Sequence, residues 1–486
     1  MRTAIRIPPA LTVFVIAAAV VMTAPAAVLA FPPTADAGGP YTIAEGEALT
    51  LDGSGSFDPD LDPITYEWNI NNQGTWADVT GVSPTLTWAQ LQSYGVDDDG
   101  SYQIVLRVTA GGETDTHAAT LTVGNTAPTL SVTGPSAIGE GATFTLNLSS
   151  NDPGADAITS WKVNWGDGAI ETIPGNPSQV SHDYVRAGYT YDILVSATDE
   201  DGVWHQSELL VGSQDLDSVF RFAPNTGAFL QEFGMGSGLD HTRGLDIGPD
   251  GRLYVCGHFS TNVLRYDGTT GAFVDEFVAA GAGGLSNPVG LTFGPDGHLY
   301  VSNHAPDKVI RYDGATGAFI DDFVTAGSGG LYDPAGIAFG PGGHLYVTSE
   351  QGNSVLRYDG ISGDFIDTFV PPGSGGLNQP YDLVFGPDGN LYVTSHGNGD
   401  IIRYDGTTGA FIDVFTTESG MGEGASLVFG PDGHLYGSFL FDDNIVRFDG
   451  TTGAEMNDYV AIGEGGLDSP VFLTFVPVQS VTVTPG

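Results

Sequence analysis

The chain has one cysteine, Cys256, among its 486 residues, so it cannot form an intrachain disulfide. Basic residues are also scarce: lysine occurs only as Lys162 and Lys308, and 14 lysines and arginines face 59 acidic residues, a net charge of −45. Such a chain repels the phosphates of nucleic acids and anionic membranes, so we exclude both as partners. The sequence has no second long apolar run after its N-terminal one, so we expect no membrane insertion of the mature protein.

Glycine and proline, by contrast, are abundant, with 71 and 29 copies, while the hydrophobic fraction of 41% is ordinary for a folded protein. This composition is typical of many short strands joined by tight turns, and the length allows several domains. We therefore expect an all-β protein built from more than one module.

The N-terminus has the pattern of an export signal. Arg2 and Arg6 precede an apolar run over residues 11–22, and small residues before Phe31 suit a cleavage site. The apolar run is short for a bilayer span. We assign residues 1–30 as a signal peptide and predict a secreted, extracellular protein.

Residues 31–124 and 125–212 show short alternating strands between turns, the spacing of an antiparallel β-sandwich. The second segment contains Val-Asn-Trp-Gly-Asp-Gly at 163–168 and His-Asp-Tyr at 182–184, and the first contains Leu-Asp-Gly-Ser-Gly-Ser at 51–56. These motifs resemble those of PKD domains, which implies immunoglobulin-like spacer or adhesion modules. The first segment departs from the pattern because Asn-Ile-Asn follows its central tryptophan where a Gly-Asp-Gly turn is usual.

Several aspartates of these modules have two interpretations. Their side-chain oxygens could cap turns, or they could bind a hard cation, for which calcium is the candidate. The residues concerned are Asp58, Asp60, Asp62, Asp152 and Asp156. Calcium is the one cofactor that the sequence suggests, and both interpretations stay open.

From residue 213 the chain repeats itself. A Gly-Pro-(Asp/Gly)-Gly turn recurs at Gly248, Gly294, Gly340, Gly386 and Gly430, so neighbouring copies lie 44 to 46 residues apart. A period in the forties with four strand-like runs per unit is typical of a propeller blade. One blade cannot bury both faces of its sheet alone, whereas a closed ring of blades can.

The repeat predicts a six-bladed propeller over 213–486, closed by C-terminal strands that pair with its N-terminal strands. In this scheme the tail at 476–483 is the second strand of a blade shared with 219–222 and 228–230. A rival scheme puts 208–212 in that slot, but we place those residues in the second sandwich. The repeats resemble NHL-type propellers, a superfamily with gluconolactonase-like and streptogramin-lyase-like members. This resemblance implies a fold and leaves function open.

A binding site should break a pattern that every blade repeats. The longer and more varied loops emerge on one face of the disc, where propellers usually bind ligands. Two rings of positions face that way, one just before the inner strands and one just after the second strands. The first ring holds His241, Asn287, Asp333, Gln379 and Glu423, and the second holds His258, His304, Glu350 and His396. Histidines and carboxylates on consecutive blades could bind a metal or act as acid and base, and strand-end capping is the competing interpretation.

Two classes of function follow from this organisation. The first is an extracellular binding or adhesion protein, with sandwich spacers and a propeller face that binds a glycan, peptide or small ligand. The second is a metal-assisted propeller enzyme, a lyase or lactone hydrolase, that uses the second ring. We favour the first class and assign no catalytic residue.

Overall fold

The computed structural model describes residues 31–72, 74, 76, 78–185, 187–340, 342–417 and 424–484. The predicted signal peptide and Glu423 lie outside these residues. The described chain is all-β, as its composition predicts, and divides into two compact units, 1–125 and 126–486. None of its helices is both long and apolar enough to pass through a lipid bilayer.

The first unit is a small sandwich around the buried side chains of Trp68, Leu106 and Leu121. Its larger sheet has the order β1-β7-β6-β3-β4, and β2 pairs with β5. The strands are β1 (Tyr41–Ala44), β2 (Leu49–Thr50), β3 (Thr65–Asn69), β4 (Val79–Thr80), β5 (Thr85–Leu86), β6 (Gly100–Ala110) and β7 (Glu113–Gly124). Helix α1 (Trp88–Ser93) begins after Thr87, whose side chain accepts from the Gln90 amide in a capping box.

The second unit begins with another sandwich. One sheet has the order β13-β10-β8, and the facing sheet has the order β12-β11-β14-β40-β9, with β15 beside β14. The strands are β8 (Thr129–Thr133), β9 (Ala137–Gly139), β10 (Thr143–Asn151), β11 (Ser160–Asn164), β12 (Ile170–Pro174), β13 (Gln179–Asp183), β14 (Tyr189–Thr198), β15 (Val203–His205) and β40 (Gln479–Thr484). Its core contains Phe144, Trp161 and Trp165 from the sandwich itself and Val481 and Val483 from β40.

The rest of the second unit consists of four-stranded antiparallel sheets, of which the described residues form six. The inner strands are β19 (Thr242–Ile247), β23 (Pro288–Phe293), β27 (Pro334–Phe339), β31 (Pro380–Phe385), β35 (Gly424–Phe429) and β39 (Pro470–Phe475). The second strands are β20 (Arg252–Gly257), β24 (Leu299–Asn303), β28 (Leu345–Ser349), β32 (Leu391–Ser395), β36 (Leu435–Phe439) and β16 (Leu209–Ser213).

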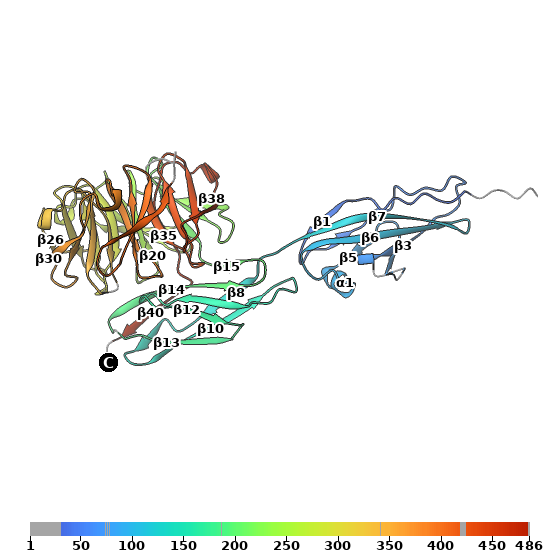
Figure 1. The fold of residues 1–486 in the computed structure, drawn as a ribbon, viewed down its shortest axis with the longest axis horizontal. Coiled ribbons are helices and arrows are strands. Elements are labelled where there is room, and N and C mark those ends of the chain that lie inside the picture. The colour runs from blue at the N-terminus through green and yellow to red at the C-terminus, as the bar shows by residue number, and fades with distance from the viewer. Residues whose placement is uncertain are drawn as a thin grey trace, which may run out of the picture. The chain divides into compact units, whose positions relative to one another are not determined.

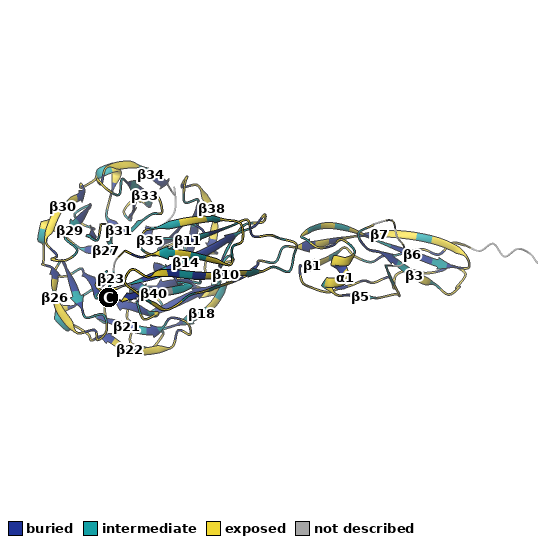
Figure 2. Cartoon of the chain, turned by 90° about the horizontal axis from the view of Figure 1, so that it is seen from below, coloured by how far each residue is buried: buried dark blue, intermediate teal, exposed yellow. Residues whose placement is uncertain are grey.

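The third and outer strands complete each sheet. The third strands are β21 (Asn262–Asp267), β25 (Lys308–Tyr312), β29 (Ser354–Tyr358), β33 (Asp400–Tyr404), β37 (Asn444–Phe448) and β17 (Ser218–Phe222). The outer strands are β22 (Phe273–Val278), β26 (Phe319–Val324), β30 (Phe365–Val370), β34 (Phe411–Thr417), β38 (Glu455–Val460) and β18 (Phe229–Phe233). Figure 2 shows exposed residues on β22, β26, β30 and β34 at the circumference.

The inner strands follow one another around an axis in a propeller-like arrangement (Figure 2). Each inner strand contacts the next, and β39 contacts both β35 and β19. The second strands are buried along their length because neighbouring sheets cover both of their faces. Tyr300, for example, is fully buried between Phe323 of its own sheet and Phe339 of the next sheet.

The shared sheet differs from the predicted two-plus-two arrangement. Among the described residues, the C-terminal segment adds β39 alone to this sheet, and β16 occupies the second position, with the order β18-β17-β16-β39. The rival scheme for residues 208–212 was therefore the correct one. β16 suits the second position of this sheet, which neighbouring sheets cover on both faces, because all five of its residues are buried there.

The tail itself belongs to the second sandwich and not to the shared sheet. β40 pairs antiparallel with β14 and parallel with β9, and Figure 1 shows it among the strands of that sandwich. The physical reason is burial: the side chains of Val481 and Val483 enter the sandwich core. The sandwich and the ring of sheets are thus joined by two chain connections rather than one.

Candidate functional site

The two predicted rings of polar residues are joined by backbone hydrogen bonds. The amide of each second-ring residue donates to the carbonyl of the first-ring residue beside it, over 3.1 Å for His258 and His241 and 3.2 Å for His304 and Asn287. Glu350 with Asp333 and His396 with Gln379 follow the same rule. The described first-ring residues all have φ between 51° and 63°, in the left-handed region. The fold therefore fixes these backbones, while the side chains differ from blade to blade.

Four of these side chains lie next to one another in a row that crosses three blades. The ring centroids of His241 and His258 are 5.7 Å apart, and those of His258 and His304 are 6.1 Å apart. His304 Nε2 then lies 3.4 Å from Glu350 Oε2. The structure thus brings together residues that the sequence placed on consecutive blades.

His258 is held in one tautomer. Its Nδ1 lies 3.0 Å from the Pro288 carbonyl, which can only accept, so Nδ1 carries the proton. Its Nε2 is then the acceptor for the Asn287 side-chain amide at 3.3 Å. Burial lowers the pKa of His258 to about 4, so the ring is neutral at pH 7. Both ring nitrogens are engaged, which makes His258 a positioning residue in this arrangement.

Arg243 and Tyr381 belong to the same cluster, and the sequence reasoning did not select them. The Arg243 guanidinium lies 3.2 Å from His241 Nε2 and 5.8 Å from the centre of the Tyr381 ring. Burial and the charge of Arg243 lower the pKa of His241. The sequence does mark these two residues, because Arg243 and Tyr381 occupy a repeat position that holds Val289, Ala335 and Val471 in other blades.

Tyr381 extends the cluster to the far blades. Its ring stacks on His396 at 5.2 Å and lies 5.8 Å from the ring of Phe472. His396 Nδ1 also lies 3.2 Å from the Gly424 carbonyl. We name this set, with His241, Arg243, His258, His304 and Glu350, the loop-face cluster. It offers imidazoles, one guanidinium, one carboxylate and aromatic faces.

Asp333 and Gln379 lie next to the cluster. Burial raises the pKa of the Asp333 carboxyl, which the charge of His304 partly offsets. The Asp333 amide donates to Asp307 Oδ1 at 2.8 Å, and the Gln379 amide donates to Asn353 Oδ1 at 2.7 Å. Strand-end capping therefore accounts for the backbone of these positions and leaves their side chains available for other roles.

Two of the sandwich aspartates, Asp58 and Asp152, cap turns in the described structure. Asp58 Oδ1 accepts from the amides of Asp60 and Asp62 at 2.9 and 3.0 Å. Asp152 Oδ1 accepts from the Gly154 amide at 2.8 Å, and Asp156 lies in the loop that follows β10. Calcium binding by these residues stays a prediction.

Comparison with known proteins identifies the front modules. Residues 30–123 and 125–211 each match the family model described as PKD domain, so both segments are PKD domains, as their motifs indicate. The chain is also 28% identical over 136 residues to Chitinase A of Pseudoalteromonas piscicida. That match covers 27% of this chain and 16% of the chitinase.

Solved structures similar to the chain include two lyases and a protein of unknown function. A virginiamycin B lyase from Staphylococcus aureus is 17% identical, with 64% of this chain and 96% of the lyase covered and a TM-score of 0.37. A protein of unknown function from Bacteroides caccae is 15% identical, with 56% and 99% covered and a TM-score of 0.43. A streptogramin B lyase is 14% identical, with 59% and 97% covered and a TM-score of 0.38.

Proposed function

We propose that this chain is an extracellular binding protein. Its PKD domains act as spacers, and its six sheets act as a closed six-bladed propeller whose loop-face cluster binds a glycan, a peptide or a small ligand. The observation that carries the proposal is the mutual contact of repeat-breaking side chains, Arg243, Tyr381 and the histidines, at one end of the inner strands. Side chains that depart from the blade repeat are not required by the fold, so they are the residues whose identity a bound ligand would explain.

Exposed aromatic residues in neighbouring loops support a binding role. Phe259 is 57% exposed and stacks on His241 at 4.5 Å, while Tyr332 and Phe441 are 54% and 66% exposed. Aromatic faces and hydrogen-bonding groups together are the surfaces that bind sugars and peptides. The similarity to a chitinase and the PKD domains are compatible with an extracellular polysaccharide as the ligand.

Profiling on a glycan and peptide array tests the proposal. Arg243→Ala and Tyr381→Ala should each weaken binding of the best ligand about tenfold or more, since each removes a side chain from the centre of the cluster. His298→Ala, in a turn at the other end of the sheets, is the matched control and should bind normally. Equal binding by all three variants would show that the ligand site lies elsewhere.

A metal-assisted lyase or lactone hydrolase is the second candidate. The contact of His304 Nε2 with Glu350 Oε2 favours it, because imidazole and carboxylate at 3.4 Å could share a divalent ion. The engaged nitrogens of His258 argue against a ligand role for that residue. Metal analysis of the purified chain and of His304→Ala and His396→Ala separates the two functions: a stoichiometric metal lost in the variants supports the enzyme.

A further inference from the structure

A cavity of about 510 Å³ lies at the opposite end of the inner strands from the loop-face cluster. Its floor is formed by the last residues of the inner strands and the Gly-Pro turns that follow them. Its roof is the second sandwich, through residues 166–168 and 190–192. The volume lies within the usual range for small-molecule sites.

The cavity exists because the sandwich touches the ring on one side. Ser196 Oγ donates to the Pro431 carbonyl at 3.0 Å, and Lys162 Nζ lies 3.5 Å from the Asp432 carbonyl. Both contacts are made to the turn after β35. Over the turns after β23 and β27, residues such as Gly294, Gly297 and Gly340 line the open space below the sandwich.

The lining combines aromatic rings with carboxylates. Phe293, Phe339 and Phe385 reach the cavity from three successive inner strands, and Asp246 and Asp192 face it from the floor and the roof. The cavity-lining residues within the described chain include no lysine or arginine. A partly apolar space with negative charge and without a counter-ion side chain favours a cation over a neutral or anionic molecule.

Asp246 is the carboxylate on the floor of the cavity, and the backbone amides of Phe293 and Ile247 donate to it. Its Oδ2 accepts from Thr292 Oγ1 at 3.3 Å, a long bond. Burial, reinforced by the negative charge of Asp192, raises the pKa of Asp246 to about 7. The third carboxylate, Asp167, already pairs with His182 Nε2 at 2.8 Å. A cation bound in the cavity would offset the cost that burial imposes on the ionised Asp246 carboxylate.

We propose that this cavity binds a small organic cation that carries an apolar group, with Asp246 as the counter-ion and the rings of Phe293, Phe339 and Phe385 around the apolar part. An alkyl- or arylammonium compound has this chemistry. The site is separate from the loop-face cluster, so it goes beyond the proposed function and does not depend on it.

Calorimetric titration of the full chain with benzyltrimethylammonium tests the proposal, and benzyl alcohol serves as the neutral compound with the same ring. We expect the cation to bind and the alcohol to bind about tenfold more weakly or not at all. Asp246→Asn should weaken cation binding about tenfold or more. Phe339→Leu, which removes an aromatic ring but retains an apolar side chain, should weaken cation binding severalfold. Asp388→Asn, which removes a turn carboxylate outside the cavity, should bind as the wild type does.

Three results would overturn the proposal. They are no heat with the cation at millimolar concentration, equal affinity for the alcohol, and unchanged cation binding by Asp246→Asn. Melting temperatures of the variants show that each is folded, and Phe339→Leu keeps the test decisive if Asp246→Asn is unstable. Arg243→Ala should leave cation binding unchanged, so failure here is distinct from failure of the loop-face site.

Discussion

The hydroxyls of Thr190 and Thr482 lie 2.9 Å apart, although the two residues are 292 positions apart in the sequence. The contact joins β14 and β40, and it shows that the last described strand of the chain completes the second PKD domain rather than the propeller. The chain leaves this sandwich, forms the ring of sheets and returns to the same sandwich. The sandwich and the ring should therefore depend on each other for stability.

Val481→Ala tests this dependence. Val481 is fully buried in the sandwich core, so loss of two methyl groups should lower the free energy of unfolding by about 2 kcal/mol. Denaturant unfolding followed by tryptophan fluorescence measures the change. Val185→Ala, at a side chain that is 91% exposed, is the control and should have little effect. Equal stability of the two variants would contradict the placement of β40.

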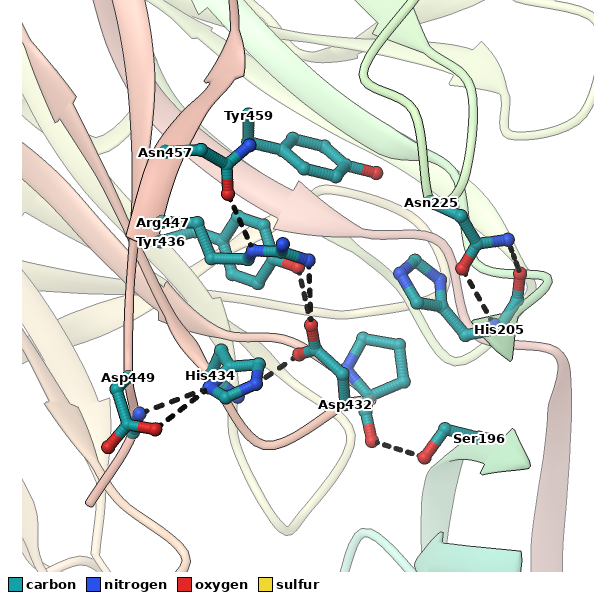
Figure 3. Close-up of polar contacts among 12 residues, drawn as sticks. Ser196, His205, Asn225, Asp432, His434, Tyr436, Arg447, Asp449, Asn457 and Tyr459 are labelled. Atoms are coloured by element: carbon teal, nitrogen blue, oxygen red, sulfur yellow. Dashed lines mark hydrogen bonds and ion pairs between the residues drawn. The ribbon is translucent and has the colours of Figure 1, made fainter. Parts of the chain in front are cut away.

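His205 should make the junction between sandwich and propeller sensitive to acid. The residue is 3% exposed, and neither ring nitrogen has a hydrogen-bond partner in the described structure. Asn225 bonds only its backbone, as Figure 3 shows. Burial lowers the pKa of His205 from 6.5 to about 4. As the pH falls below 6.5, His205 is protonated in the unfolded chain but stays neutral in the folded chain until about pH 4. Protonation therefore favours the unfolded chain, and the free energy of unfolding decreases.

The expected loss from His205 is about 2 kcal/mol between about pH 7 and pH 5. His205→Leu keeps the apolar contact with Phe475 and should remove this part of the pH dependence. Unfolding free energies at several pH values give the comparison, with Val185→Ala, which changes no titratable group, as the control that should retain the wild-type slope. A slope unchanged in His205→Leu would refute the assignment.

Cys256→Ser should stabilise the protein. At the equivalent position Ser302 donates to the Ala335 carbonyl of the next sheet at 2.6 Å, a bond that a thiol makes poorly. A serine at 256 should donate to the Val289 carbonyl in the same way and add about 1 kcal/mol. Ser302→Cys is the reverse variant and should lose a similar amount. Burial also raises the pKa of the Cys256 thiol, so the native protein should not react with a thiol reagent.

Asn457→Asp should also stabilise, though only at low salt. Four blades pair an arginine with an aspartate across the third and outer strands, as Arg311 does with Asp321 at 2.5 Å, whereas Arg447 meets Asn457. Restoring the carboxylate should gain about 0.5 kcal/mol, because such pairs are partly exposed to solvent. Thermal melts at low and high salt measure it, and a gain that persists at high salt would have another cause.

Much of the organisation follows from local pattern. The period of the Gly-Pro turns located the strands of each sheet from β19 onward, and the Trp165 motif indicated a PKD domain. The candidate site was predictable only in part. His241, His258 and His304 come together because equivalent positions in neighbouring blades must be close. The contact of Arg243 with Tyr381 joins the first and fourth repeats and depends on the geometry of the whole ring.

The repeat and its turns determined, from sequence alone, that this chain forms all-β sheets with a polar loop face. Only the tertiary structure decided which sheets receive β16 and β40. Both are short runs of apolar and β-branched residues, and a strand's own residues do not specify which distant edge will supply its hydrogen bonds. The choice depends on which core buries each strand: the propeller sheets bury Val211, and the sandwich buries Val481.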